Sequence, residues 1–122
     1  MKSGVILLSH GSRSKEANEN AIIVGEMVKK KYNIEPLLVT FMELAEPSLE
    51  DGVRRLIEEE KVDHIKVVPL FLNNGIHLKR DVPRMLEELR TQYGHVTFNQ
   101  GRPFGTDERL VDLVYERIEE LS

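Results

Sequence analysis

Two histidines follow apolar runs at places where loops commonly carry chemistry. His10 comes directly after "GVILLS" at residues 4–9, and His77 lies in "FLNNGIHLKRDVP", which continues the apolar run "IKVVPL". Loops at strand ends often carry functional residues, and imidazoles both accept protons near neutral pH and bind divalent ions. The two histidines therefore predict a site for proton transfer or for a metal ion.

Carboxylates and cations also fall in the loops that follow the apolar runs of the sequence. The segment "MELAEP" at 42–47 supplies Glu43 and Glu46. Two imidazoles and one carboxylate leave coordination positions open, which favours a divalent ion that is bound briefly and then released. Taken singly, these residues also have plainer interpretations, since a histidine can be an ordinary loop residue and Glu46 can cap the helix that follows it. The basic residues of the same loops are Arg13, Lys79, Arg80 and Arg102.

Several familiar chemistries lack their residues in this sequence. The absence of cysteine excludes disulfides, thiolate nucleophiles and Cys-based metal sites. No glycine-rich phosphate loop matches the dinucleotide or mononucleotide pattern. Ser12 beside His10 has no nucleophile elbow around it, and two distant histidines do not close a structural zinc site. Proton transfer coupled to a transiently bound ion remains the favoured chemistry.

The composition predicts a single compact domain spanning residues 1–122. Of these residues 40% are hydrophobic, which suits one core in a chain of this length. The net charge of -4 with 31% charged residues argues against a nucleic-acid partner, which would usually meet a basic surface. The N-terminal apolar run is too short for a spanning helix or a signal peptide, so we expect a cytoplasmic protein without a membrane partner.

The hydrophobic pattern predicts four strands that alternate with four helices. This alternation indicates a three-layer, flavodoxin-like α/β fold in which helices flank a four-stranded parallel sheet. Ligands of such sheets bind beyond the carboxyl ends of the strands, where His10, Glu43 and the segment 72–77 all fall. Strands are expected at 4–9, 35–42, 64–72 and 95–99, and helices at 15–32, 46–60, 81–93 and 106–121.

Finer expectations follow from the same pattern. Pro69 has no N–H to donate, so strand pairing should be interrupted near it. His64 and His95 precede their strands and should lie at the opposite edge of the sheet as surface or capping residues. Thr106 should cap the last helix. The apolar residues expected to face inward are Ala17, Ala21, Val24, Val28 and Tyr32 in the first helix and Leu110, Leu113, Val114, Ile118 and Leu121 in the last.

The motifs taken together resemble a known protein family. "LLSHGSR", "FMELAEPSL", "VVPLFLNNGIHLKRDVP" and "GRPFGTDERLVDLVYER" occur in this order and cover essentially the whole chain. They resemble the class II tetrapyrrole chelatases, above all the small sirohydrochlorin cobaltochelatases and their nickel- and iron-inserting relatives. The specific part of the resemblance is "HGS" followed later by "GIHxxxDVP".

The resemblance implies a chelatase half-unit that inserts a divalent metal into sirohydrochlorin, with Co²⁺ as the first expectation, Ni²⁺ or Fe²⁺ as alternatives and no organic cofactor. It implies that His10 is the general base and a metal ligand, that His77 is a second catalytic, metal-binding histidine, and that Glu43 handles the metal or a proton. Longer family members hold two such units in tandem, so a single unit implies a homodimer. The implied substrate contacts are Glu46, Leu72, Asn73, Asn74, Gly75, Ile76 and His77.

Proton chemistry supports the same assignment without the family. Metal entry must remove two pyrrole protons from the macrocycle, and an imidazole is suited to accept protons near neutrality. Coordination and protonation compete for one imidazole nitrogen, so two histidines that share the work would relieve that conflict. A carrier that binds metal or tetrapyrrole without inserting anything, and a flavodoxin-like interaction domain with no ligand, stay open as functions of another class.

Overall fold

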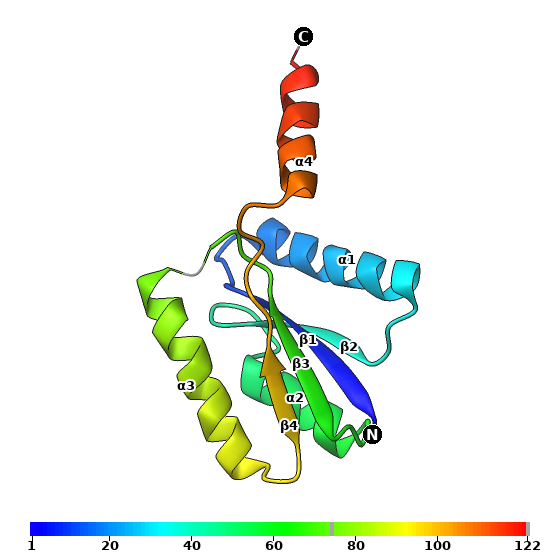
Figure 1. Cartoon of the computed structure of the whole chain (residues 1–122), viewed down its shortest axis with the longest axis vertical. Helices are drawn as coiled ribbons and strands as arrows, with labels where there is room; N and C mark the ends of the chain where they lie inside the picture. Colours follow the sequence, from blue (N-terminus) through cyan, green and yellow to red (C-terminus); the bar gives the residue numbers. More distant parts are fainter. Residues whose placement is uncertain (74, 122) are drawn as a thin grey trace.

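The computed structural model contains a four-stranded parallel sheet with helices on both faces (Figure 1). The structure describes residues 1–73 and 75–121, with His77 described by its backbone alone. The strands are β1 (Ser3–Ser9), β2 (Leu37–Phe41), β3 (His64–Pro69) and β4 (Thr97–Gln100), in the spatial order β2-β1-β3-β4. The helices are α1 (Lys15–Tyr32), α2 (Leu49–Glu58), α3 (Ile76–Gln92) and α4 (Glu108–Glu119). The predicted three-layer α/β fold is confirmed.

One face of the sheet carries the main core. Side chains such as Ile6 of β1 are fully buried there against Val53 of α2 and Leu86 of α3. Helix α1 lies on the opposite face, over β2, where Gly25 is its one buried residue among those described. A Cβ on Gly25 would lie 2.3 Å from Val39 Cγ2, so the missing side chain is what allows this close approach. The sheet thus carries two helices on one face and, on the other, one helix that lies over the edge strand β2.

Strand pairing on the β4 side of β3 breaks near Pro69, as predicted. β3 pairs with β1 as far as Pro69, and the next N–H, of Leu70, donates to the Leu8 carbonyl at 2.8 Å. Because successive amides alternate in direction, the nitrogen of Pro69 faces β4, where it has no hydrogen to donate. On the β4 side of β3, the Val67 carbonyl still accepts a hydrogen bond. The next carbonyl along the chain that accepts one from the segment after β4 is that of Phe71. The sheet therefore loses its regular ladder just before the β3 loop.

Helix α2 begins later than predicted. Its N-cap is Ser48, whose hydroxyl accepts a hydrogen bond from the Asp51 N–H at 3.1 Å. Glu46 and Pro47 both precede this cap, so the expected start at residue 46 and the interpretation of Glu46 as the cap were wrong. The Ser48 hydroxyl satisfies a free N–H group of the first turn. This capping bond, rather than the preference of proline for helix starts, sets where the helix begins.

Helix α3 begins earlier than the start predicted from "DVP" at 81–83. It starts at Ile76 after the N-cap Gly75, and Pro83 lies inside it. Pro83 is exposed, so water can reach the carbonyl that its missing N–H leaves free. Val82 and Leu86, on the apolar side of this helix, are fully buried.

Helix α4 departs most from prediction, because it projects beyond the carboxyl ends of the strands instead of packing on the sheet (Figure 1). Its cap is Asp107 rather than Thr106, and none of its residues is buried. An amphipathic pattern specifies an apolar face but not the surface that covers it, which is why the inward assignment was wrong. Leu110 is half-buried, and the exposed residues of the predicted inward set are Leu113, Val114, Ile118 and Leu121.

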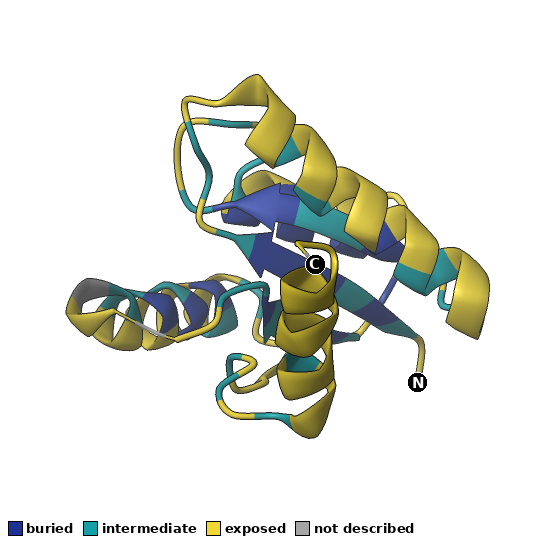
Figure 2. Ribbon diagram, turned by 90° about the horizontal axis from the view of Figure 1, so that it is seen from above, coloured by how far each residue is buried: buried dark blue, intermediate teal, exposed yellow. Residues whose placement is uncertain are grey.

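Helix α1 is also more exposed than its pattern indicated (Figure 2). Ala21 and Val28 are half-buried, whereas Ala17, Val24 and Tyr32 are exposed. The reason is that α1 has no neighbouring helix on its own face of the sheet. No helix in the described part of the chain is both long and apolar enough to cross a membrane.

Candidate metal and proton-transfer site

His10 and Glu43 meet where β1 and β2 end. The two strands are in register at Ser9 and Phe41, and pairing continues past both ends. The Met42 N–H donates to the Ser9 carbonyl at 2.9 Å, and the Glu43 N–H donates to the His10 carbonyl at 3.2 Å. Backbone hydrogen bonds thus fix the two functional residues side by side, although they are far apart in the sequence.

The side chains of His10 and Glu43 face each other in solvent. Nε2 of His10 lies 3.9 Å from Oε1 of Glu43, and the side chains are 55% and 58% exposed. Two ligand atoms that each lie about 2.1 Å from one divalent ion are at most about 4.2 Å apart. The observed separation therefore allows both atoms to bind one ion, and their exposure allows that ion to arrive and leave.

The other nitrogen of His10 sets the state of the imidazole. Nδ1 of His10 lies 3.2 Å from the carbonyl oxygen of Gly11. A carbonyl only accepts, so Nδ1 must carry the hydrogen in this bond, which leaves the Nε2 lone pair of the neutral ring directed to the Glu43 side. That lone pair can take either a proton or a metal ion.

Gly11 allows the two strand extensions to come together. Its φ is +95°, and a Cβ at this position would lie 1.7 Å from the Glu43 carbonyl oxygen. Both the backbone conformation and the space therefore require glycine. The "HG" pair of the sequence is therefore a geometric unit, in which the glycine after His10 makes room for the backbone carbonyl of Glu43.

Asn18 supports the same loop and was not found by sequence reasoning. Its side-chain oxygen accepts a hydrogen bond from the Ser12 N–H at 2.9 Å, and its amide donates to the Ser12 carbonyl at 2.8 Å. These two hydrogen bonds hold the backbone of Ser12 in place, as a neighbouring strand would. The signal available in the sequence was an asparagine four residues after Ser14, at the start of the predicted helix.

The loop after β3 leaves the sheet next to the loop of His10, because β1 and β3 are neighbours. Leu72 and Asn73 are exposed in this loop, and Gly75 and Ile76 are exposed at the start of α3. Leu72 and Asn73 also line a hollow of about 370 Å³ against the first turns of α4. Asn74 and the side chain of His77 lie outside the described residues, so the structure places only the backbone of His77, in the first turn of α3.

The remaining predicted residues are exposed near the edge of the sheet that carries His10. Glu46 is exposed in the loop after β2, and the cations Arg13, Lys79 and Arg102 are exposed at the same edge of the sheet. Arg80 is exposed too, and its Nε lies 3.6 Å from Asp81 Oδ1. These side chains surround the edge that carries His10 without contacting it in any interaction seen among the described residues.

The other two histidines lie at the amino ends of their strands, as predicted. His64 has a structural role, because Nδ1 lies 3.1 Å from Ser3 Oγ and Nε2 lies 2.6 Å from Asn99 Oδ1. His95 is exposed in the connection before β4. Neither residue belongs to the candidate site.

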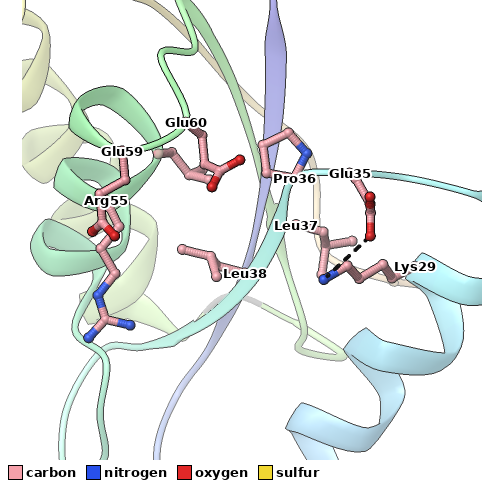
Figure 3. A pocket seen from close by; sticks show the side chains of 9 residues that line it. Lys29, Glu35, Pro36, Leu37, Leu38, Arg55, Glu59 and Glu60 are labelled. Atoms are coloured by element: carbon pink, nitrogen blue, oxygen red, sulfur yellow. Dashed lines mark ion pairs between the residues drawn. The ribbon is translucent and has the colours of Figure 1, made fainter.

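A cavity of about 310 Å³ lies at the opposite end of β2 (Figure 3). It is lined by Lys29, Glu35, Arg55, Glu59 and Glu60 together with apolar side chains. Lys29 and Glu35 form an ion pair at 3.9 Å on one side of it. Its side chains have no imidazole and both signs of charge, so it does not match the chemistry of the His10 edge. Within the described part of the chain, no group of three or more His, Cys, Asp or Glu residues is arranged to hold a metal ion.

Comparison with known proteins assigns the family. The CbiX family model matches residues 4–121. This chain belongs to the CbiX family. The resemblance to the class II tetrapyrrole chelatases is confirmed, and this CbiX chain carries "SHGSR" at the end of β1 and "GIHLKRDVP" at the start of α3, the helix that follows the neighbouring strand β3.

Three relatives show how the CbiX chain compares in length. A sirohydrochlorin ferrochelatase from Priestia megaterium is 39% identical over 97% of this chain and 44% of its own length. A sirohydrochlorin cobaltochelatase from Sulfurisphaera tokodaii is 36% identical over 97% of this chain and 92% of its own length. The sirohydrochlorin chelatase SirB from Bacillus subtilis subspecies spizizenii, solved in complex with cobalt, is 32% identical, with a TM-score of 0.91 over 98% of this chain and 51% of SirB. The chain therefore spans about half of the ferrochelatase and about half of SirB, and nearly all of the cobaltochelatase.

Proposed function

We propose that this chain inserts a divalent metal ion into sirohydrochlorin, with Co²⁺ as the first choice. The observation that carries the proposal is the facing pair of His10 and Glu43, 3.9 Å apart on the carboxyl ends of adjacent strands. The relatives named above as sirohydrochlorin cobaltochelatase and ferrochelatase, and the cobalt complex of SirB, support both the macrocycle and the class of metal. Residues 1–122 would act as one domain in the cytoplasm.

In this proposal the exposed pair delivers the metal and receives protons. Insertion forms bonds from the metal to the macrocycle nitrogens and releases two pyrrole protons. Nε2 of His10 first shares the ion with Glu43 and, as the ion moves to the macrocycle, accepts one of the two protons, which the exposed carboxylate can pass to solvent so that the same nitrogen can accept the second. His77, in the first turn of α3, would supply the second imidazole from the neighbouring loop.

The macrocycle would lie against the loop after β3. Its carboxylates need cationic or N–H partners, and Lys79 and Arg80 are exposed in the first turns of α3. The loop residues proposed to contact it are Glu46, Leu72, Asn73, Asn74, Gly75, Ile76 and His77. The edge of one subunit would contact only one side of the flat macrocycle. We therefore propose a homodimer in which a second copy covers the other side.

The test is an absorbance assay with purified chain and sirohydrochlorin. Co²⁺, Ni²⁺ and Fe²⁺ are each added in turn under anaerobic conditions, and the spectral change is timed against the same mixture without protein. We expect acceleration with Co²⁺, and the order of rates among the three ions decides the metal, since imidazole and carboxylate bind all three. If the protein accelerates insertion of none of them, the chelatase proposal is wrong.

A further inference from the structure

The hydrogen bond that fixes the His10 ring depends on one peptide group, the one that joins Gly11 to Ser12. The carbonyl of this Gly11–Ser12 peptide is the oxygen that lies 3.2 Å from Nδ1 of His10. A peptide group is planar, so its carbonyl and its N–H point in opposite directions and turn together. Whatever holds the N–H of Ser12 therefore also sets the direction of the carbonyl that His10 uses.

Gly11 makes a further attachment of this peptide necessary. The close approach of the Glu43 carbonyl requires glycine at this position. Glycine, however, allows a wider range of backbone angles than any other residue, so the peptide that follows it can turn more easily. The carbonyl of His10, just before Gly11, is held by the Glu43 N–H at 3.2 Å. A firmly held His10 thus stands next to a peptide that needs support of its own.

Asn18 supplies that support at the N–H end of the peptide. Its Oδ1 accepts a hydrogen bond from the Ser12 N–H at 2.9 Å, and its Nδ2 donates to the Ser12 carbonyl at 2.8 Å. Because a backbone N–H only donates and a carbonyl only accepts, the side-chain amide fits in one orientation. An aspartate of the same shape could not donate the second bond, so the pair of bonds is specific for asparagine.

The first turn of α1 keeps the Asn18 side chain in place. The Asn18 N–H donates to the Ser14 carbonyl at 3.3 Å, and the Ser14 hydroxyl caps the helix by accepting from the Ala17 N–H at 3.3 Å. The Ser14 N–H donates to Oγ of Ser12 at 3.0 Å. Asn18 is half-buried, whereas Ala17 and Glu19 beside it are exposed. The start of the helix thus carries a side chain that faces the loop and bonds both backbone groups of Ser12.

We propose that Asn18 is a positioning residue that keeps the His10 imidazole ready to bind the metal ion. Hydrogen bonds lead from Oδ1 of Asn18 through the Gly11–Ser12 peptide to Nδ1 of His10, and they leave the Nε2 lone pair on the side of Glu43. Metal-binding histidines are commonly fixed by a hydrogen bond from the second ring nitrogen. Here the oxygen that fixes the ring belongs to a peptide that a side chain of α1 orients. The inference rests on the proposed function for its effect on metal insertion.

The tautomer of His10 in the metal-free chain tests the proposal directly. Long-range proton–nitrogen NMR spectra, recorded at a pH above the range in which imidazole titrates, distinguish a ring with its hydrogen on Nδ1 from one with its hydrogen on Nε2. The His10 signals are assigned by their loss in His10→Ala. We expect the Nδ1–H form in the native chain, and a native His10 that carries its hydrogen on Nε2 would overturn the proposal before any variant of Asn18 is made.

Asn18→Ala removes both bonds to Ser12 and should release the Gly11–Ser12 peptide. We expect the His10 signals to move toward those of a ring that exchanges between its two tautomers. The affinity of the chain for Co²⁺ alone, measured by calorimetry, should fall roughly 10- to 100-fold, the usual effect of losing a group that orients a metal-binding histidine. A folded Asn18→Ala that keeps the native tautomer, or the native affinity for Co²⁺, would overturn the proposal.

Ser14→Ala is the matched control, because it weakens the start of α1 without removing a bond to the Gly11–Ser12 peptide. It deletes the hydroxyl that accepts from the Ala17 N–H, so the chain should unfold at a lower urea concentration. The His10 tautomer and the Co²⁺ affinity should nevertheless stay native. If Ser14→Ala changes the tautomer as much as Asn18→Ala does, general loosening of the loop is sufficient and the specific role of Asn18 is wrong.

These measurements are independent of the macrocycle. Metal insertion into sirohydrochlorin is assayed on the native chain beside them. A native chain that shows the Nδ1–H tautomer, loses it in Asn18→Ala and yet inserts no metal would reject the chelatase proposal and leave the role of Asn18 at His10 standing. An active chain whose tautomer does not depend on Asn18 would do the reverse.

Discussion

His10→Ala should lower the rate of metal insertion roughly 10²- to 10⁴-fold, the usual range for loss of a positioned general base. The variant removes the Nε2 atom that lies 3.9 Å from the Glu43 carboxylate, and with it one ligand and the proton acceptor of the proposed step. His10 is exposed, so the fold should be unaffected and sirohydrochlorin binding should be largely retained. The measurement is the initial rate with Co²⁺ together with a binding titration of the macrocycle.

His95→Ala is the matched control for this variant. His95 is also an exposed histidine, but it lies before β4 at the opposite edge of the sheet, so its loss should leave the rate unchanged. Added imidazole should restore part of the rate to His10→Ala, because a small base can enter the space that the side chain leaves. A rate equal to that of the native chain in His10→Ala would reject the assignment, and macrocycle binding without turnover in the native chain would favour a carrier.

Gly11→Ala should destabilise the fold and also slow insertion. The new Cβ would lie 1.7 Å from the Glu43 carbonyl oxygen, and an alanine at φ +95° is strained in itself. Backbone strain of this kind costs about 1–3 kcal/mol, and displacement of the Glu43 segment should add to it. We expect the free energy of unfolding to fall by about 2 kcal/mol or more, measured by urea denaturation followed by circular dichroism.

Gly94→Ala provides the comparison for the stability measurement. No atom lies within 4 Å of a Cβ built at Gly94, and its φ is not in the left-handed region, so the change should stay within about 0.5 kcal/mol. If Gly11→Ala unfolds at the same urea concentration as the native chain, then the strand extensions that carry His10 and Glu43 are not held together in the way described above.

Sequence reasoning indicated the candidate site because parallel strands bring their carboxyl ends to one edge. That rule selected His10 and Glu43 before any distance was known, and the two side chains face each other. The break at Pro69 was predictable for a similarly local reason, since an absent N–H cannot pair. The geometry of Gly11 was not predictable, because its requirement comes from a carbonyl oxygen of a residue distant in sequence.

The position of α4 shows where local patterns stop being informative. The spacing of Leu110, Val114 and Ile118 correctly predicts an amphipathic helix. It cannot tell which surface that helix covers, since any complementary apolar face of this chain or of a second copy satisfies the pattern equally. The direction of the helix depends on tertiary hydrogen bonds to the β3 loop, such as that from Gly105 to Leu72, and no local propensity encodes these.

The central claim is that the metal ion passes through the pair formed by His10 and Glu43. Anomalous diffraction at the cobalt edge from crystals soaked in Co²⁺ locates the ion directly. The account predicts cobalt about 2.1 Å from Nε2 of His10 and a similar distance from the Glu43 carboxylate. Cobalt bound at full occupancy elsewhere, with the imidazole of His10 free of metal, would contradict it.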